Sequence, residues 1–228
     1  MSIEKKQRIM TLVRAILSFL EANRSHSEGA DLVMRKVEAL DLSLAAIADR
    51  EPRLERHAEV LSHAIEDISS ADLRDIAEGL KLAQHDLVWR EDDGRYYPPD
   101  ADLGDGYRNC NLHTVLIGPD ACGFEAAGFC LGLFMLGPRT LYRDHAHAAP
   151  ELYVNLSPRS GWRLSDGWWR DFEAGSLIWN APGEVHATRA YERPFLSVFV
   201  WLEDIEAQCQ VVPFPDWPDI EGKLRQDS

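Results

Sequence analysis

The 228-residue chain is poor in cysteine, and the cysteines it has are not grouped. Cys110, Cys122, Cys130 and Cys209 are widely separated and form no CxxC pair. Disulfide-stapled domains are small and dense in cysteine, whereas this chain has enough apolar residues to form a core without disulfides, so that class is not expected. We therefore expect free thiols in a reducing compartment, and with them a cytoplasmic location.

Positive charge and long hydrophobic runs are also scarce. The 24 Lys and Arg residues stand against 38 Asp and Glu, which gives a formal net charge of −14. Such a surface repels phosphate backbones and anionic lipid, so neither nucleic-acid binding nor membrane association is expected. The most apolar stretch, GFCLGLFMLG, is shorter than the about 20 residues that a membrane helix needs. Charged and polar residues interrupt the apolar part of the N-terminal segment, and no small-residue cleavage site follows, so an amphipathic helix is expected there rather than a signal peptide.

Tryptophan is absent from the first 88 residues, where the hydrophobic pattern is helical. The first apolar stripe follows i, i+3, i+4, i+7 spacing and comprises Ile9, Leu12, Val13, Ile16, Leu17 and Leu20. Later stripes predict further helices, one of them with Pro52 near its first turn, where proline is tolerated. We predict a helical region over residues 1–88, whose stripes would suit core packing or a homodimer contact.

Residues 89–228 have a different pattern. Gly, Pro, Asp and Asn cluster at the start of this part, which indicates a loop. From about residue 108, short apolar or alternating runs are separated by turn signals roughly every 8–12 residues, as in a β-sandwich or barrel. The chain is therefore predicted to be α+β, with helices over 1–88 and a β-barrel over 89–228.

The stretch DHAHAAPELY carries four chemically active side chains at positions of one parity: His145, His147, Glu151 and Tyr153. Side chains alternate faces along a strand, so each pair is expected to point into the same cavity. His186, behind a glycine turn, could add a third imidazole from a facing strand. Three nitrogens and one carboxylate oxygen would hold one divalent transition metal ion with open positions, and iron, manganese, nickel, zinc and cobalt all suit that set.

Two motifs resemble those of the cupin family. Residues 137–161 have the order of the first cupin motif: a glycine, HxH, a glutamate and a second glycine. Residues 175–186 resemble the second motif, although the proline directly precedes the glycine, while the glycine-to-histidine interval is kept. The resemblance implies a small double-stranded β-barrel, with His145, His147, Glu151 and His186 as metal ligands.

A narrower resemblance runs from about Cys130 to Trp201. Tyr153, two residues after the glutamate, does not belong to the general cupin pattern. Together with Tyr142 and Trp201 it is similar to the cupin-type dimethylsulfoniopropionate (DMSP) lyases. These enzymes cleave a zwitterionic sulfonium compound to dimethyl sulfide and acrylate, so the resemblance implies the same small substrate here.

The implied reaction is a β-elimination, in which a metal bound to the substrate carboxylate helps a base to remove the α-proton. Tyr153 is the expected base, and Tyr142 could share that role. Trp201 and Tyr142, with Trp179 as a further candidate, could hold the sulfonium cation against aromatic faces.

Other functions suit the same predicted barrel. Open metal positions would equally serve another metal-dependent cupin enzyme, such as an Fe(II) dioxygenase or an isomerase. A non-catalytic cupin that binds a small molecule is a third alternative. The fold does not separate these functions, because each depends on the site.

Overall fold

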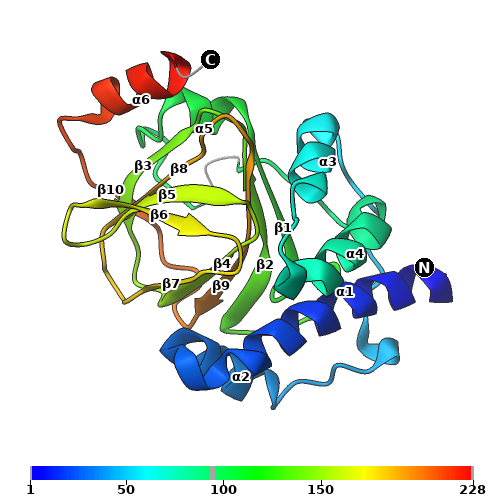
Figure 1. Ribbon diagram of the computed structural model, residues 1–228. Coiled ribbons are helices and arrows are strands. Elements are labelled where there is room, and N and C mark those ends of the chain that lie inside the picture. The colour runs from blue at the N-terminus through cyan, green and yellow to red at the C-terminus, as the bar shows by residue number, and fades with distance from the viewer. Residues whose placement is uncertain (1, 93–95, 227–228) are drawn as a thin grey trace.

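The computed structural model describes residues 2–92 and 96–226, and two five-stranded antiparallel sheets lie at its centre (Figure 1). The strands are β1 (Asn111–Ile117), β2 (Phe129–Leu136), β3 (Leu141–Ala146), β4 (Glu151–Asn155), β5 (Arg159–Arg163), β6 (Trp169–Glu173), β7 (Leu177–Asn180), β8 (His186–Arg189), β9 (Phe195–Leu202) and β10 (Gln210–Val211). One sheet has the order β1-β2-β9-β4-β7 and the other β10-β3-β8-β5-β6. Side chains from both sheets share one interior cluster, so the sheets form the double-stranded β-barrel of the cupin fold.

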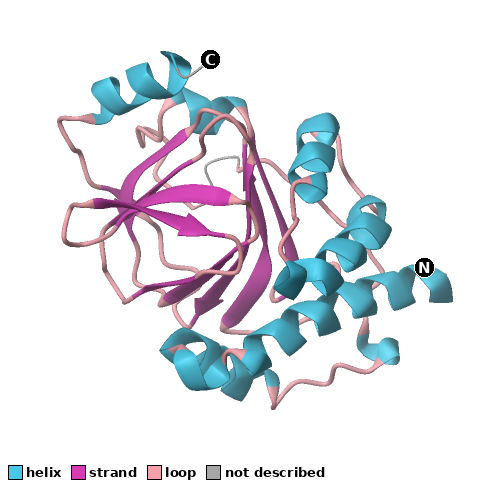
Figure 2. Cartoon of the chain, viewed as in Figure 1, coloured by secondary structure: helices cyan, strands magenta, loops and turns pink. Residues whose placement is uncertain are grey.

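The helices of residues 3–83 precede the barrel and lie against one side of it, whereas the helix of residues 217–226 follows the last strand and lies away from them (Figure 2). The α-helices are α1 (Ile3–Ala22), α2 (Glu28–Val37), α3 (Ala58–Glu66), α4 (Arg74–Ala83), α5 (Asp105–Asn109) and α6 (Trp217–Gln226). The 3-10 helices are η1 (Arg24–His26), η2 (Leu44–Ala46), η3 (Ala71–Leu73) and η4 (Gln84–Asp86). The predicted α+β class is confirmed, and the proposed division at residue 88 falls between η4 and β1. Within the described residues, no helix is long and apolar enough to cross a membrane.

The start of the third helix was predicted wrongly. Helix α3 begins at Ala58, and the segment with Pro52 is not helical. Arg53 instead pairs with the chain before the barrel: its N–H donates to the Leu87 carbonyl at 3.1 Å, and its carbonyl accepts from the Trp89 N–H at 2.7 Å. Tertiary hydrogen bonds therefore outweigh the local helical pattern here.

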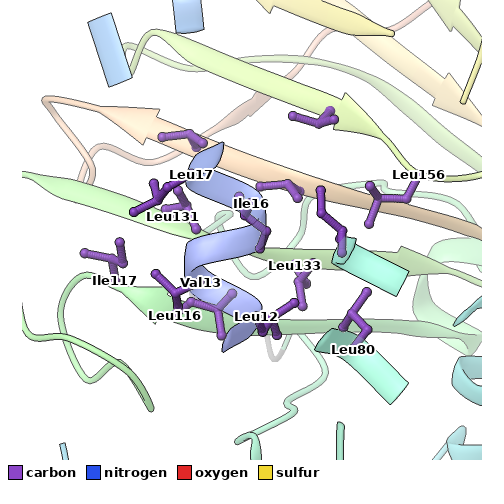
Figure 3. Packing of buried hydrophobic residues seen from close by; sticks show 14 of the residues in the cluster. Leu12, Val13, Ile16, Leu17, Leu80, Leu116, Ile117, Leu131, Leu133 and Leu156 are labelled. Atoms are coloured by element: carbon purple, nitrogen blue, oxygen red, sulfur yellow. The ribbon is translucent and has the colours of Figure 1, made fainter. Parts of the chain in front are cut away.

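The apolar stripe of α1 packs on the outer face of the first sheet (Figure 3). Val13 and Ile16 of α1 share one core with Leu131 and Leu133 of β2. Every residue of β2 is buried, because its alternate side chains face the helices and the barrel interior. Because the stripe covers the sheet, it is not left exposed for a second copy of the chain. The homodimer therefore stays a prediction.

The strand register places the inward-facing polar residues side by side. His145 on β3 is paired with His186 on β8. Glu151 begins β4, between Trp201 of β9 and Asn180 of β7. Leu152 of β4 faces the helices, so the residues on either side of it face the interior.

Candidate metal centre and cavity

Three buried histidines converge inside the barrel. His145 and His186 are neighbours across the β3–β8 pair, and His147 follows directly after β3. One nitrogen of each ring lies within 4.8 Å of the corresponding nitrogen of the other two. Metal–nitrogen bonds of about 2 Å place ligand atoms about 3–4 Å apart, so a small contraction would bring all three onto one ion.

The same hydrogen bond orients each imidazole. In all three rings Nδ1 lies 2.8–2.9 Å from a backbone carbonyl two residues away, to which an Nδ1–H donates. This fixes the tautomer and leaves the Nε2 lone pair pointing into the barrel. Histidines held in this way are prepared to ligate a metal through Nε2.

Glu151 completes the donor set. Its Oε2 lies 3.0 Å from Nε2 of His147 and 3.3 Å from Nε2 of His186. The Nε2 of His186 is buried and has no hydrogen-bond partner among the described residues. A lone pair facing a carboxylate oxygen at these distances is repulsive unless a proton or a cation lies between them. A metal ion therefore fits this site, and the four predicted ligands are brought together.

Burial and charge set the protonation of these groups. Burial lowers the pKa of His145 well below its usual range, and the two neighbouring histidines lower it further. Burial disfavours the charged forms of both His147 and Glu151. The attraction between the two side chains outweighs this effect, so the pKa of His147 is raised and that of Glu151 is held well below its usual range. The site thus presents an ionised carboxylate to the imidazoles.

Tyr153 is the next inward-facing residue of β4 after Glu151. Its side chain is buried and lines a cavity of about 330 Å³, as do Glu151, Tyr142 and Trp201. Burial raises the pKa of Tyr153 well above its usual value, and the negative charge of Glu151 raises it further. In the metal-free site Tyr153 is therefore a neutral phenol.

Tyr142 is enclosed by other aromatic rings. Its ring stacks on His145 at 4.1 Å on one side and on Tyr107 at 4.4 Å on the other, between centroids. Its hydroxyl is hydrogen-bonded to that of Tyr97. Burial and the adjacent Tyr97 raise the pKa of Tyr142 well above its usual value.

The two tryptophans predicted near the substrate lie on opposite faces of one sheet. Trp201 faces the interior, where its Nε1–H donates to Oε1 of Glu151 at 2.6 Å and its ring lies 4.6 Å from that of His147. Trp179 packs on the outer face against Gly29 of α2. The expectation that Trp179 contacts the substrate was wrong, because it is paired with the outward-facing Leu152 on β4.

Sequence reasoning missed several residues of the interior. Tyr96 and Tyr97 belong to a stretch that the sequence indicates only as loop, yet both pack against the barrel cluster. Tyr107 of α5 donates a hydrogen bond to Asp92 at 2.8 Å and lines the cavity. Asn180 donates to Oε2 of Glu151 at 3.3 Å. Adjacent tyrosines were a signal for the first two, whereas Asn180 is identified only by strand register.

Comparisons with known proteins agree on one protein family. Residues 25–197 match the family model described as dimethylsulfoniopropionate lyase. The chain is 31% identical over 75 residues to the dimethylsulfoniopropionate lyase DddQ of Ruegeria pomeroyi, a match that covers 33% of this chain and only 37% of that relative.

Solved structures show the same fold. A chain from the crystal structures of the DMSP lyases RdDddP and RnDddQII superposes with a TM-score of 0.69 at 19% identity, covering 92% of this chain and 100% of the other. DddQ from Ruegeria pomeroyi DSS-3 gives a TM-score of 0.56 at 21% identity, with 80% and 94% covered. The likeness extends over the helices as well as the barrel.

Proposed function

This chain belongs to the dimethylsulfoniopropionate lyase family, and on that premise we propose that it is a metal-dependent carbon–sulfur lyase. The substrate is DMSP, a small zwitterion with a carboxylate at one end and a dimethylsulfonium group at the other. The α-carbon loses a proton, the Cβ–S bond breaks, and a double bond forms between the two carbons. One DMSP gives one dimethyl sulfide, one acrylate and one proton.

The observation that carries the proposal is that three histidines converge on Glu151, which lines one cavity together with Tyr153. His145, His147, His186 and Glu151 would hold the cofactor, and Tyr153 follows Glu151 on the same inward face. A divalent transition metal ion bound there would withdraw charge from the substrate carboxylate and lower the pKa of Tyr153. Iron, manganese, nickel, zinc and cobalt each suit these ligands.

Tyr153 then acts as the base. Its Oη takes the proton from the α-carbon, while the dimethyl sulfide that leaves is neutral and needs no acid. Tyr142 is the alternative base, but its hydroxyl is engaged with Tyr97 and its ring is held between His145 and Tyr107. These contacts favour Tyr153 as the base and leave Tyr142 as part of the wall.

Aromatic side chains hold the sulfonium. This cation has no hydrogen-bond donor, so the faces of aromatic rings are suitable partners, worth about 0.5–2 kcal/mol each. Trp201 and Tyr142 both line the cavity and carry this role in the proposal, and Tyr96 lies edge-on to Trp201 at 5.6 Å between ring centroids. The same walls exclude water from the reacting carbons.

The test is headspace gas chromatography of the metal-loaded protein with DMSP, together with acrylate determination. We expect equal amounts of dimethyl sulfide and acrylate, at a rate that does not depend on oxygen. His186→Ala should lose both metal and activity, whereas His63→Ala, at an exposed position on α3, should keep both. No dimethyl sulfide above a metal-stripped control would contradict the lyase, and oxygen consumption would favour a dioxygenase.

A further inference from the structure

We propose that Trp201 and Asn180 are positioning residues that hold the Glu151 carboxylate in its ligating orientation. The inference rests on the proposed metal centre and deepens it. It assigns Trp201 a second task besides facing the substrate, and it assigns Asn180 its first.

The strand register creates this arrangement. Glu151 on β4 lies opposite Trp201 on β9 and opposite Asn180 on β7, so the three side chains form one row across three adjacent strands. The row faces the barrel interior, and all three residues are buried. Neighbouring strands lie about 4.8 Å apart, so each flanking side chain can reach the carboxylate.

Each oxygen of the Glu151 carboxylate accepts one N–H hydrogen bond from a side chain of this row. Trp201 Nε1–H donates to Oε1 at 2.6 Å, and Asn180 Nδ2–H donates to Oε2 at 3.3 Å. Oε2 is also the oxygen that faces Nε2 of His147 and of His186. The indole therefore occupies Oε1 and directs Oε2 at the imidazoles, which favours a carboxylate that ligates through a single oxygen.

The carboxylate needs this restraint. The terminal torsion of a glutamate is broad, so without partners the group could turn its two oxygens freely. It is also fully buried, and a buried charge without donors is costly. The flanking N–H groups satisfy the charge and fix its orientation.

Two further observations support the assignment. The Trp201 ring lies 4.6 Å from the His147 ring at an interplanar angle of 35°, so one side chain restrains two ligands. Oδ1 of Asn180 is buried and has no hydrogen-bond partner among the described residues. Turning the amide over would set that oxygen against the carboxylate, so Nδ2 is the atom that faces Glu151.

The test measures metal binding rather than catalysis. Apoprotein is titrated with Co²⁺ against a chromophoric chelator, and the visible spectrum of the Co²⁺ protein is recorded. Trp201→Phe keeps an aromatic ring beside His147 but removes the N–H, and Asn180→Leu removes the second donor. Trp217→Phe is the matched control, because its Nε1–H donates to the Asp144 carboxylate at 2.7 Å outside the metal site.

We expect Trp201→Phe to weaken Co²⁺ binding by about 10- to 100-fold and to change the Co²⁺ spectrum, with a smaller loss for Asn180→Leu. Trp217→Phe should leave the Co²⁺ affinity and the Co²⁺ spectrum unchanged, although its melting temperature should fall. Unchanged affinity and spectrum in both site variants would overturn the inference. A native protein that binds Co²⁺ but releases no dimethyl sulfide would contradict the lyase and leave this inference standing. A native protein that binds no Co²⁺ would overturn both.

Discussion

Single side chains decide the chemistry of the proposed site, and Tyr153 is the one with the most specific role. It lies two residues after Glu151 on a strand, which places both groups at the same cavity. Tyr142 also lines the cavity, but its hydroxyl is bonded to Tyr97. The Tyr142 oxygen is therefore hydrogen-bonded to another phenol, whereas Tyr153 is the next inward-facing residue after Glu151.

Replacing Tyr153 by Phe should lower kcat by at least about 100-fold, because the base is lost while the four metal ligands stay in place. Metal content, measured by atomic emission, should be unchanged. Tyr142→Phe is the matched comparison and should retain more activity. The reverse order of the two variants would transfer the role of base to Tyr142.

The pH dependence of metal binding follows from His147. Its pKa is raised above the ordinary 6.5 by Glu151, although burial opposes the charge. Below the raised value His147 carries a proton that the incoming ion must displace, and above it the ring is already neutral. Metal affinity should thus fall as the pH is lowered through that value. Calorimetry in two buffers of different ionisation enthalpy should detect the released proton, and identical heats at pH 6.5 would contradict its release.

At the level of elements, strand β3 is fixed from both faces. His145 faces the proposed metal site, and the preceding Asp144 faces α6 and β5 instead. The Asp144 carboxylate accepts hydrogen bonds from the guanidinium of Arg163 and from the indole of Trp217. Arg163 is 3% exposed and Asp144 is fully buried, so this pair lies away from solvent. The alternation of a strand thus separates a structural ion pair from a functional site.

Asp144→Ala should reduce the free energy of unfolding by about 3 kcal/mol, because it leaves the buried Arg163 guanidinium without its main partner. Urea unfolding at constant pH measures the change. Asp166→Ala is the control, since its partner Arg170 is about half exposed and surface pairs contribute little. Equal losses in the two variants would show that burial does not determine the value of the Asp144 pair.

The sequence predicts those parts of the site that depend on local spacing. Strand alternation correctly predicted that the side chains at positions 145, 147, 151 and 153 point into the barrel. The apolar spacing correctly predicted which face of α1 is buried. Long-range register was not accessible in this way, so Asn180 was missed and Trp179 was placed on the wrong face. The helix expected near Pro52 failed for the same reason, because distant residues supply the hydrogen bonds there.

At the level of the whole molecule, the helices and the barrel share one hydrophobic core. Residues of α1, α4 and the outer face of β2 belong to a single cluster. Each fully buried leucine in it contributes about 2 kcal/mol relative to exposure, so neither part keeps its stability if the other is removed. The proposed parts 1–88 and 89–228 are therefore expected to unfold together.

Tryptophan distribution provides a direct test of this coupling. All seven tryptophans lie after residue 88, and Trp162, Trp169, Trp179 and Trp201 are on barrel strands, so their fluorescence is weighted towards the barrel, while circular dichroism at 222 nm is dominated by the helices. We expect the two thermal transitions to coincide, as for a two-state protein. Separate midpoints would show that the helical region and the barrel are independent domains.

The central claim is that the histidine–glutamate site binds a metal ion that the cleavage of DMSP requires. The most direct measurement is the rate of dimethyl sulfide release as metal is added back to stripped protein. The rate should rise linearly and level off at about one equivalent, as a single mononuclear site demands. A rate that is already maximal in the stripped protein, or that stays at zero through saturation, would contradict the claim.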